Sequence, residues 1–386
     1  MDVFLKKIII VLLLISFLIP NVYASDDSLN LDSASAILID ASSGKVLYEK
    51  NIDERLPMAS MTKIMSMLLI MENIHNGSLN YTDKVLISKN ASGMGGSQVF
   101  LTEGEEYKVE DLLKCIAVSS ANDAVVAMAE KISGSEANFV ELMNNKAREL
   151  GLTNTNFTNP HGLDNENHYS TAKDMAMLAK ELLKYEDILK FTSIYEDYLT
   201  KPDGSQVWLV NTNRLVRFYD GVDGLKTGYT TNAGYCLTAT AKKGDLRLIS
   251  VVMRSTSGDA RSKDTATLLT YGFNSFKNHI IYSKDTPLGE IKVLNGKVDK
   301  VNVYLKSDAT ELLGITAKPS GYSFNIKVNS IKAPVNKDTT IGKAEIIDNN
   351  SNIISEIDII VKEDILKASF WDHFKRNFGT ITSGIY

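Results

Sequence analysis

The segment SMTKIMSMLLIM, residues 60–71, decides how the first half of this chain is organised. Its apolar residues follow one another so closely that, at about 3.6 residues per turn, they cover every face of a helix. A helix that is apolar on all sides has to be surrounded by protein. The sequence therefore predicts a central, buried helix that begins at Ser60 and carries one charged residue, Lys63.

Helical and β-type patterns continue on both sides of this segment. Short β-type runs at 36–39 and 45–48, joined by turn residues, predict a β-hairpin. Capping residues and helical spacing predict that the rest of the first half is mostly helical, whereas strands at hairpin spacing appear after Asp220. We expect helices at 109–118, 122–132, 135–150, 170–185 and 263–276, and strands at 225–230, 235–241 and 246–253.

The C-terminal part of the chain has a different character. From about Tyr282 to Glu363, short runs alternate between apolar and polar residues, which predicts a separate all-β domain. From Ile365 to Phe378, aromatic and aliphatic residues gather near one helical face. This pattern favours an amphipathic helix that lies in a membrane interface. A terminal helix docked on its own domain is the alternative.

The first 24 residues have the pattern of a secretory signal peptide. Lys6 and Lys7 precede an apolar run from Ile8 to Ile19, and small residues at 22–24 provide a cleavage site. An uncleaved anchor is the weaker alternative, because this run is too short for a helix to cross about 30 Å of hydrocarbon. The sequence predicts an exported protein.

Composition excludes several classes of function. The 386 residues, 44% of them apolar, suggest two or three globular domains. A net charge of -5 lacks the basic excess that nucleic-acid binding requires. Cys115 and Cys236 lie in apolar runs and are expected as buried thiols. The five histidines are scattered, and no cysteine and histidine cluster has metal-ligand spacing, so we expect no metal and no other cofactor.

Three short motifs carry the chemistry, in the order Ser60-Met61-Thr62-Lys63, Ser120-Ala121-Asn122 and Lys226-Thr227-Gly228. Taken singly, the first two are weak signals, because S-x-x-K recurs at 42–45 and 170–173 and S-x-N recurs at several places. The structural alternatives are a helix N-cap for the first serine, a surface lysine three residues later, and turn formers in the second motif.

The first motif has the spacing of a nucleophile and its base. Residues three apart share a helix face, so the Lys63 amine can reach the Ser60 hydroxyl. A lysine accepts the hydroxyl proton only when it is neutral, and burial together with a second cation, Lys226, favours the neutral amine. The start of the helix at Ser60 also directs backbone N–H groups at the reacting centre, where they would stabilise an oxyanion.

These motifs, in this order, resemble those of the penicillin-recognising serine enzymes. The neighbouring sequence is similar to one branch of them, the low-molecular-mass D-alanyl-D-alanine carboxypeptidases, which are low-molecular-mass penicillin-binding proteins. The resemblance covers Ala34 to about Lys277 and, more loosely, the residues beyond. Four stretches carry it: LPMAS (56–60), SANDA (120–124), NPHGLD (159–164) and DGLKTGY (223–229).

The resemblance implies an α/β fold of the β-lactamase and transpeptidase type: an antiparallel sheet flanked by helices, plus a small all-β C-terminal domain. It places the active site between the sheet edge and a helical subdomain. The expected division is a signal peptide (1–24), a catalytic domain (25–281), the all-β domain (282–363) and a membrane-anchoring helix (364–386).

By this resemblance Ser60 is the acylated nucleophile and Lys63 its general base. Ser120 would relay a proton to the leaving D-alanine, and Asn122 would hold Lys63 and the substrate amide. For substrate binding, the resemblance implies that Lys226 and Thr227 hold the terminal carboxylate, with Arg261 assisting, and that Gly228 completes the motif. The N–H groups of Ser60 and Tyr229 would form the oxyanion hole. His161 and Asp174 match family positions, with no role assigned.

The implied function is removal of the terminal D-alanine from peptidoglycan stem pentapeptides, with β-lactams as covalent inhibitors. The enzyme would be peripheral to the outer face of the cytoplasmic membrane. A β-lactamase would need a loop glutamate four residues before an asparagine, and between the second and third motifs only Glu141 and Asn145 have this spacing, in a predicted regular helix. A peptidoglycan endopeptidase and an inactive wall-binding module remain as alternatives.

Overall fold

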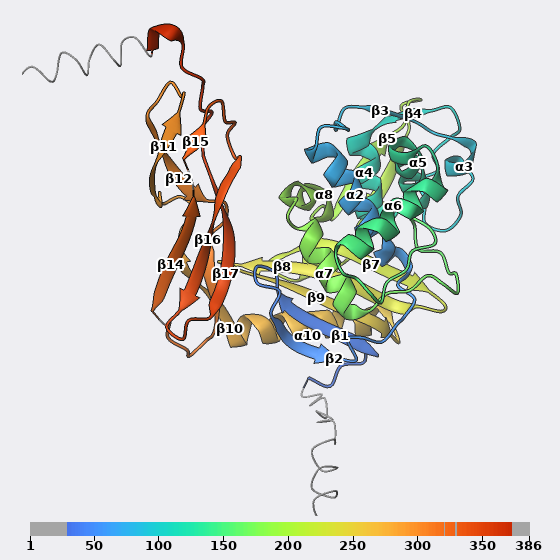
Figure 1. Cartoon of the computed structure of the whole chain (residues 1–386). Helices are drawn as coiled ribbons and strands as arrows, with labels where there is room; N and C mark the ends of the chain where they lie inside the picture. Colours follow the sequence, from blue (N-terminus) through green and yellow to red (C-terminus); the bar gives the residue numbers. More distant parts are fainter. Residues whose placement is uncertain (1–28, 320, 329, 373–386) are drawn as a thin grey trace, which may run out of the picture.

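The computed structural model describes residues 29–319, 321–328 and 330–372, so the expected signal peptide lies outside the described residues. The first domain is built on a five-stranded antiparallel sheet with the strand order β2-β1-β9-β8-β7. Its strands are β1 (Ser35–Asp40), β2 (Val46–Lys50), β7 (Val222–Thr230), β8 (Gly234–Lys243) and β9 (Leu246–Ser255). The two predicted groups of strands therefore join in one sheet, and β7 is an edge strand (Figure 1).

Both faces of this sheet are covered by helices. Side chains alternate between the faces of a strand, so Ile37 and Ile39 of β1 join the core of the helical subdomain, whereas Leu38 joins a second core under α10 (Gly258–Ser275). Helix α7 (Ala172–Leu182) packs on the other face, against β9 and β1 (Figure 1). This arrangement confirms the predicted antiparallel sheet flanked by helices.

The helical subdomain surrounds the helix predicted from residues 60–71. Ser60 lies in a short 3-10 turn, η1 (Ala59–Thr62), and α2 (Lys63–His75) follows it, with every residue from Lys63 to Met71 buried. The prediction of a central, buried helix is confirmed. The helix was expected to begin at Ser60, whereas its α-helical part begins at Lys63. Helices α4 (Val109–Ser119), α5 (Asn122–Ser133) and α6 (Glu136–Glu149) contact α2. Helix α3 (Lys89–Ser92) packs against α5, and α8 (Leu189–Thr192), which follows η2 (Glu186–Ile188), packs against α4. Helix α9 (Leu215–Phe218) lies beside β7, and its Leu215 joins the second core, under α10.

The sequence patterns missed two hairpins, the short helices α3, α8 and α9, and the start of one long helix. The hairpins pair β3 (Lys84–Leu86) with β4 (Glu106–Lys108), and β5 (Glu196–Thr200) with β6 (Gln206–Val210). Helix α10 begins at Gly258 rather than at Lys263, because the Ser257 side chain accepts a hydrogen bond from the Ala260 N–H and caps this end.

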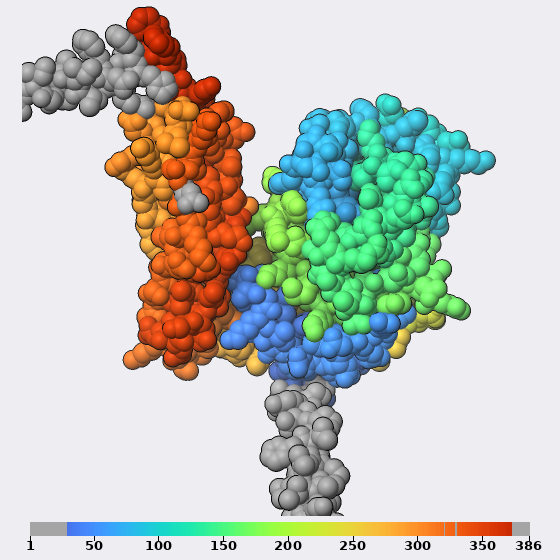
Figure 2. All heavy atoms as spheres, viewed as in Figure 1, coloured from blue at the N-terminus to red at the C-terminus, as the bar shows by residue number. Residues whose placement is uncertain are grey.

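The second domain is all-β, as predicted, and stands beside the first domain with an open gap between their upper parts (Figure 2). It begins with β10 (Phe276–Tyr282), which follows α10 directly and pairs with β13 (Ala309–Gly314). A six-stranded sheet has the order β14-β16-β17-β12-β11-β15. Its strands are β11 (Gly289–Leu294), β12 (Lys300–Leu305), β14 (Tyr322–Val328), β15 (Ile331–Lys332), β16 (Thr340–Asp348) and β17 (Ile353–Ile360).

The expected helix at the C-terminal end does not begin where the sequence pattern placed it. Ile365 is 2% exposed and exchanges two backbone hydrogen bonds with Val335, and Lys367 pairs with Gly296. Residues 365–368 are therefore an extended segment of the β domain, and the prediction of a helix from Ile365 was wrong there, because these backbone bonds and the buried isoleucine hold the chain on the sheet. A helix begins at Phe370, and its expected continuation from residue 373 lies outside the described residues. Within the described ranges, none of the helices combines the length and the hydropathy that crossing a bilayer requires.

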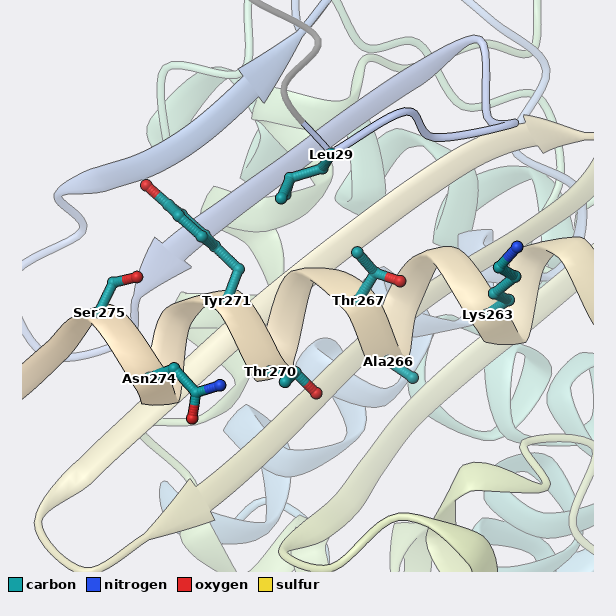
Figure 3. A pocket seen from close by; sticks show the side chains of 8 residues that line it. All are labelled: Leu29, Lys263, Ala266, Thr267, Thr270, Tyr271, Asn274 and Ser275. Atoms are coloured by element: carbon teal, nitrogen blue, oxygen red, sulfur yellow. The ribbon is translucent and has the colours of Figure 1, made fainter.

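One surface pocket lies along the solvent-facing side of α10 (Figure 3). Leu29 lies across this helix, and the pocket of about 520 Å³ is lined otherwise by residues between Lys263 and Ser275. The helical subdomain covers the opposite face of the sheet, so this pocket is separate from the three motifs.

Candidate active site

The first and third motifs meet because a glycine of β7 lies against the turn that carries Ser60. A Cβ atom at Gly228 would come within 2.6 Å of the Met58 carbonyl oxygen and 3.2 Å of the Met61 nitrogen. Only a residue without a side chain allows this approach of sheet edge and turn. The structure thus brings Lys226-Thr227-Gly228 to the side of Ser60.

The amine of Lys63 lies at the centre of this site. Its Nζ atom is 3.0 Å from Ser60 Oγ, 2.7 Å from Asn122 Oδ1 and 2.7 Å from the carbonyl oxygen of His161. The Asn122 amide donates its own hydrogen to the Gly95 carbonyl at 2.7 Å, which fixes Oδ1 toward the lysine. The side chain of Lys63 is completely buried.

These three contacts define what a neutral amine does here. Two of the three partners, Asn122 Oδ1 and the His161 carbonyl, can only accept hydrogen bonds. A neutral amine has two hydrogens, which these acceptors take, so its lone pair is left for the hydroxyl hydrogen of Ser60. Burial, and after it the charge of Lys226, holds the pKa of Lys63 well below its usual value, although Asp123 opposes the shift. The geometry suits a base that removes the Ser60 proton.

The second motif lies at the junction of α4 and α5. Ser120 has the left-handed conformation (φ 62°) that ends α4, and Asn122 begins α5. Ser120 Oγ is buried, and it has no hydrogen-bond partner in the part of the chain that the structure describes. Leaving a buried hydroxyl without a partner costs free energy, which indicates a functional role. Because no described protein group occupies this hydroxyl, it can bind a substrate or transfer a proton. Next to it, Asp123 accepts the N–H groups of Val99 and Leu101 at 3.0 and 3.1 Å and holds the segment that contacts Asn122.

The third motif supplies buried positive charge. Lys226 is fully buried, and Thr227 donates its hydroxyl hydrogen to Thr212 Oγ1 at 2.6 Å. Burial, and then the charge of Arg261, lowers the pKa of Lys226 to about 7. The Nε atom of Arg261 is buried without a hydrogen-bond partner among the described residues. Two neighbouring cations with spare donors form a site that an anion would satisfy. Tyr229, the next residue of β7, is exposed and packs on Tyr235.

The loop at 159–164 closes the site from another side. Gly162 (φ +95°) presses on the turn so tightly that a Cβ atom would lie 2.0 Å from the Ala59 carbonyl oxygen. His161 contributes its backbone carbonyl to Lys63, while its ring Nε2 lies 3.4 Å from Glu136 and lowers the pKa of that carboxyl. Asp174 lies apart from these contacts, because its carboxylate accepts from Asn154 N–H and the Thr155 hydroxyl.

Sequence reasoning missed Gly162, Thr212 and the ring of His168, which hydrogen-bonds to Thr62 next to the lysine. The NPHGLD stretch was a signal for the glycine, whereas nothing in the sequence pointed to the threonine. A pocket of about 520 Å³ continues from the loop, and most of the residues that line it are polar: Arg55, Pro57, Asp164, Asn165, Glu166, His168, Tyr169 and Asn232. Within the described residues, no three histidine, cysteine, aspartate or glutamate side chains gather as a metal site needs.

Comparison with known families gives two matches. The model described as D-alanyl-D-alanine carboxypeptidase matches residues 21–257, and the model described as penicillin-binding protein 5, C-terminal domain, matches residues 276–367. The second match begins at the first residue of β10, where the second domain begins in the structure.

Individual relatives agree with these matches. The D-alanyl-D-alanine carboxypeptidase DacF of Bacillus subtilis is 45% identical, covering 98% of this chain and 98% of its own length. The solved structure of penicillin-binding protein 5 from Haemophilus influenzae is similar with a TM-score of 0.67 and 32% identity, covering 87% of this chain and 98% of that one. Penicillin-binding protein D2 of Listeria monocytogenes, solved in its ampicillin-bound form, has a TM-score of 0.57 and 33% identity, covering 63% of this chain and 98% of that one.

Proposed function

The chain belongs to the D-alanyl-D-alanine carboxypeptidase family, and on that premise we propose that Ser60 forms the acyl-enzyme through which it removes the terminal D-alanine of peptidoglycan stem pentapeptides. The observation that carries the proposal is the contact between Lys63 Nζ and Ser60 Oγ, with both other amine partners restricted to accepting. This arrangement supplies a base for the hydroxyl proton, and burial together with the charge of Lys226 keeps that base neutral.

Acylation begins when Ser60 Oγ attacks the carbonyl carbon of the penultimate D-alanine and its proton passes to Lys63. The negative charge that develops on the carbonyl oxygen would be stabilised by the N–H groups of Ser60 and Tyr229. The C–N bond then breaks, and Ser120 relays the proton from Lys63 to the amine of the departing D-alanine. Water hydrolyses the ester of Ser60, with Lys63 again taking the proton.

Recognition of the substrate's terminal carboxylate is assigned to the buried cations at the sheet edge. Lys226 supplies charge, Thr227 a hydroxyl, and Arg261 a second cation with a spare N–H. Asn122 has one amide hydrogen not used by Gly95, which suits the carbonyl of a substrate amide.

β-Lactams are proposed to acylate the same serine. The support is the resemblance to a penicillin-binding protein solved with ampicillin, together with the constellation around Ser60. Mass spectrometry after incubation with penicillin tests the nucleophile. An adduct is expected on the wild type and on Ser42→Ala and not on Ser60→Ala. Ser42 is a matched control, because it begins another S-x-x-K sequence but its hydroxyl donates to Asp40. Labelling that survives Ser60→Ala would overturn the assignment.

The alternatives share the nucleophile and differ in substrate. Glu141, the residue that a β-lactamase reading needs, lies on the exposed side of α6. D-Alanine release from a stem pentapeptide, penicillin turnover and cleavage of crosslinked muropeptides, measured in parallel, separate carboxypeptidase from β-lactamase and endopeptidase. Binding of peptidoglycan without release of D-alanine would identify an inactive wall-binding protein.

Export and attachment to the outer face of the cytoplasmic membrane complete the proposal. The support is the sequence pattern of residues 1–24 and the exposed side chains of Phe370 and Trp371, which begin the terminal helix. Because Ile365 belongs to the β domain, the clean test removes residues from Ser369 onward. This truncation should release the protein from membranes, and unchanged sedimentation with membranes would contradict the anchor.

A further inference from the structure

A chain of buried hydrogen bonds leads from the loop after α6 to the peptide group that precedes Ser60. The N–H of Thr158 donates to His168 Nδ1 at 3.0 Å, and His168 Nε2 lies 2.6 Å from the Thr62 hydroxyl oxygen. That hydroxyl donates to the carbonyl oxygen of Ala59 at 2.7 Å. Thr62 and Ala59 are fully buried, and His168 is 3% exposed.

The direction of every bond in this chain is determined. Because Nδ1 accepts an amide hydrogen, the neutral ring carries its own hydrogen on Nε2 and donates it to Thr62. Burial lowers the pKa of His168 to about 4, so the neutral ring is the form at neutral pH. The Thr62 oxygen accepts from the ring, and its single hydrogen is therefore committed to Ala59.

The series of hydrogen bonds ends at the peptide group between Ala59 and Ser60, the proposed nucleophile. The carbonyl of Ala59 and the N–H of Ser60 belong to the same peptide unit. Ala59 has a left-handed conformation (φ +47°) that non-glycine residues rarely adopt, and Gly162 packs directly against its carbonyl. A hydrogen bond to the oxygen of an amide polarises the whole group and makes its N–H a stronger donor. Thr62 thus acts on the amide whose N–H is assigned to the oxyanion hole in the proposed function.

We propose that His168 is a positioning residue for the oxyanion hole, acting through Thr62 to orient and polarise the Ala59–Ser60 peptide group. The inference rests on the proposed function, in which the Ser60 N–H stabilises the oxyanion. His168 touches neither substrate nor the reacting atoms in this scheme. Its contribution is specific to states in which the carbonyl oxygen carries negative charge.

Two substitutions of His168 distinguish the contribution of its hydrogen bond at Nδ1 from that of its hydrogen bond at Nε2. In His168→Asn, the side-chain oxygen can replace Nδ1 as acceptor for Thr158, but the donor to Thr62 is lost. In His168→Gln, the longer side chain can place its NH₂ group where Nε2 stood and restore that donor. Thr62→Val and Thr62→Ser form a second pair, because only serine keeps the hydroxyl between His168 and Ala59.

We expect His168→Asn and Thr62→Val each to slow acylation by penicillin about tenfold, the effect of one lost hydrogen bond. His168→Gln and Thr62→Ser should stay within about threefold of the wild type, and the double variant His168→Asn/Thr62→Val should lose no more than either single change, because both break the same chain. Binding of a peptidyl boronic acid, whose adduct on Ser60 carries an oxyanion, should weaken by the same factor. KM for the pentapeptide should remain unchanged.

The outcomes distinguish this inference from the function on which it rests. Wild-type acylation rates and boronate affinity in both His168→Asn and Thr62→Val would overturn it. An equal loss in the asparagine and glutamine variants, or a parallel rise in KM, would also overturn it, because a merely structural role predicts that result. If His168→Asn fails to fold, the Thr62 pair decides alone. Failure of the wild type to be acylated at Ser60 would instead overturn the proposed function.

Discussion

Arg261 and Lys226 place two cationic side chains together at the buried edge of the sheet, and the charge of Arg261 is, after burial, the second cause of the low pKa of Lys226. Each of them is costly without an anion nearby. The two side chains create a positive electrostatic potential where the proposed function requires a carboxylate to bind. Because the pKa of Lys226 is about 7, binding of that carboxylate should depend on pH.

The first prediction concerns this pH dependence. Below a pKa of about 7, Lys226 is protonated and attracts the substrate carboxylate, whereas above it the free enzyme loses this charge. We therefore expect kcat/KM for D-alanine release to fall as the pH rises through about 7. The pH profile of kcat should have its alkaline limb, the decrease at high pH, at a higher pH than that of kcat/KM. The reason is that a bound carboxylate raises the pKa of Lys226.

Arg261→Gln tests the cause of this limb. Removing the neighbouring cation should raise the pKa of Lys226 and move the alkaline limb of kcat/KM to higher pH, even though overall affinity falls. A pentapeptide with a C-terminal amide, which offers no carboxylate, is the matched control and should show no such limb. A limb that stays in place in Arg261→Gln would contradict the assignment.

The second prediction concerns the proposed base. Lys63→Met keeps an unbranched apolar chain in the buried position and removes the amine. Acylation by a fluorescent penicillin should slow by a factor of about 10²–10⁴, the usual contribution of a general base. The free energy of unfolding should drop by about 1–3 kcal/mol, because the buried oxygens of Asn122 and His161 lose their donor. Lys45→Met, at an exposed lysine in another S-x-x-K sequence, should change neither quantity.

The sequence predicted the parts of this site that depend on local pattern. Continuous apolar residues after Ser60 indicated a buried helix, and a lysine inside that helix had to be either neutral or paired. The strands at hairpin spacing indicated the sheet that carries Lys226. These features follow from periodicity within a few residues, which a single sequence displays directly.

The parts that the sequence did not reveal depend on contacts between distant segments. Thr212 meets Thr227 only because the segment between β6 and α9 passes beside β7. His168 meets Thr62 only because its loop folds back on the turn that carries Ser60. Nothing local distinguishes these residues from others of their type. The misplaced helix start at Ile365 has the same origin, since pairing with Val335 overrides an amphipathic pattern.

The third prediction tests the close approach at Gly162. Gly162→Ala places a methyl group where the Ala59 carbonyl oxygen lies, so the turn has to move and the Ser60 N–H moves with it. We expect acylation by penicillin to fall by at least about tenfold. Gly134→Ala is the matched control, because Gly134 also has a positive φ but no atom lies within 4 Å of its added Cβ. Stopped-flow acylation of the two variants separates the clash from the conformational strain that both share.

The fourth prediction concerns the segment that leads out of the β domain. Ile365 is 2% exposed and sits in the core of that domain, whereas its neighbour Leu366 is 58% exposed. Ile365→Ala should therefore lower the free energy of unfolding of the β domain by about 2–5 kcal/mol, and Leu366→Ala should change it by less than about 0.5 kcal/mol. Scanning calorimetry measures the transition of this domain, and D-alanine release should be unaffected in both variants. If residues 365–368 were instead an amphipathic helix lying in a membrane interface, the two alanine variants would be equally stable without membranes, and that result would contradict the extended pairing with Val335.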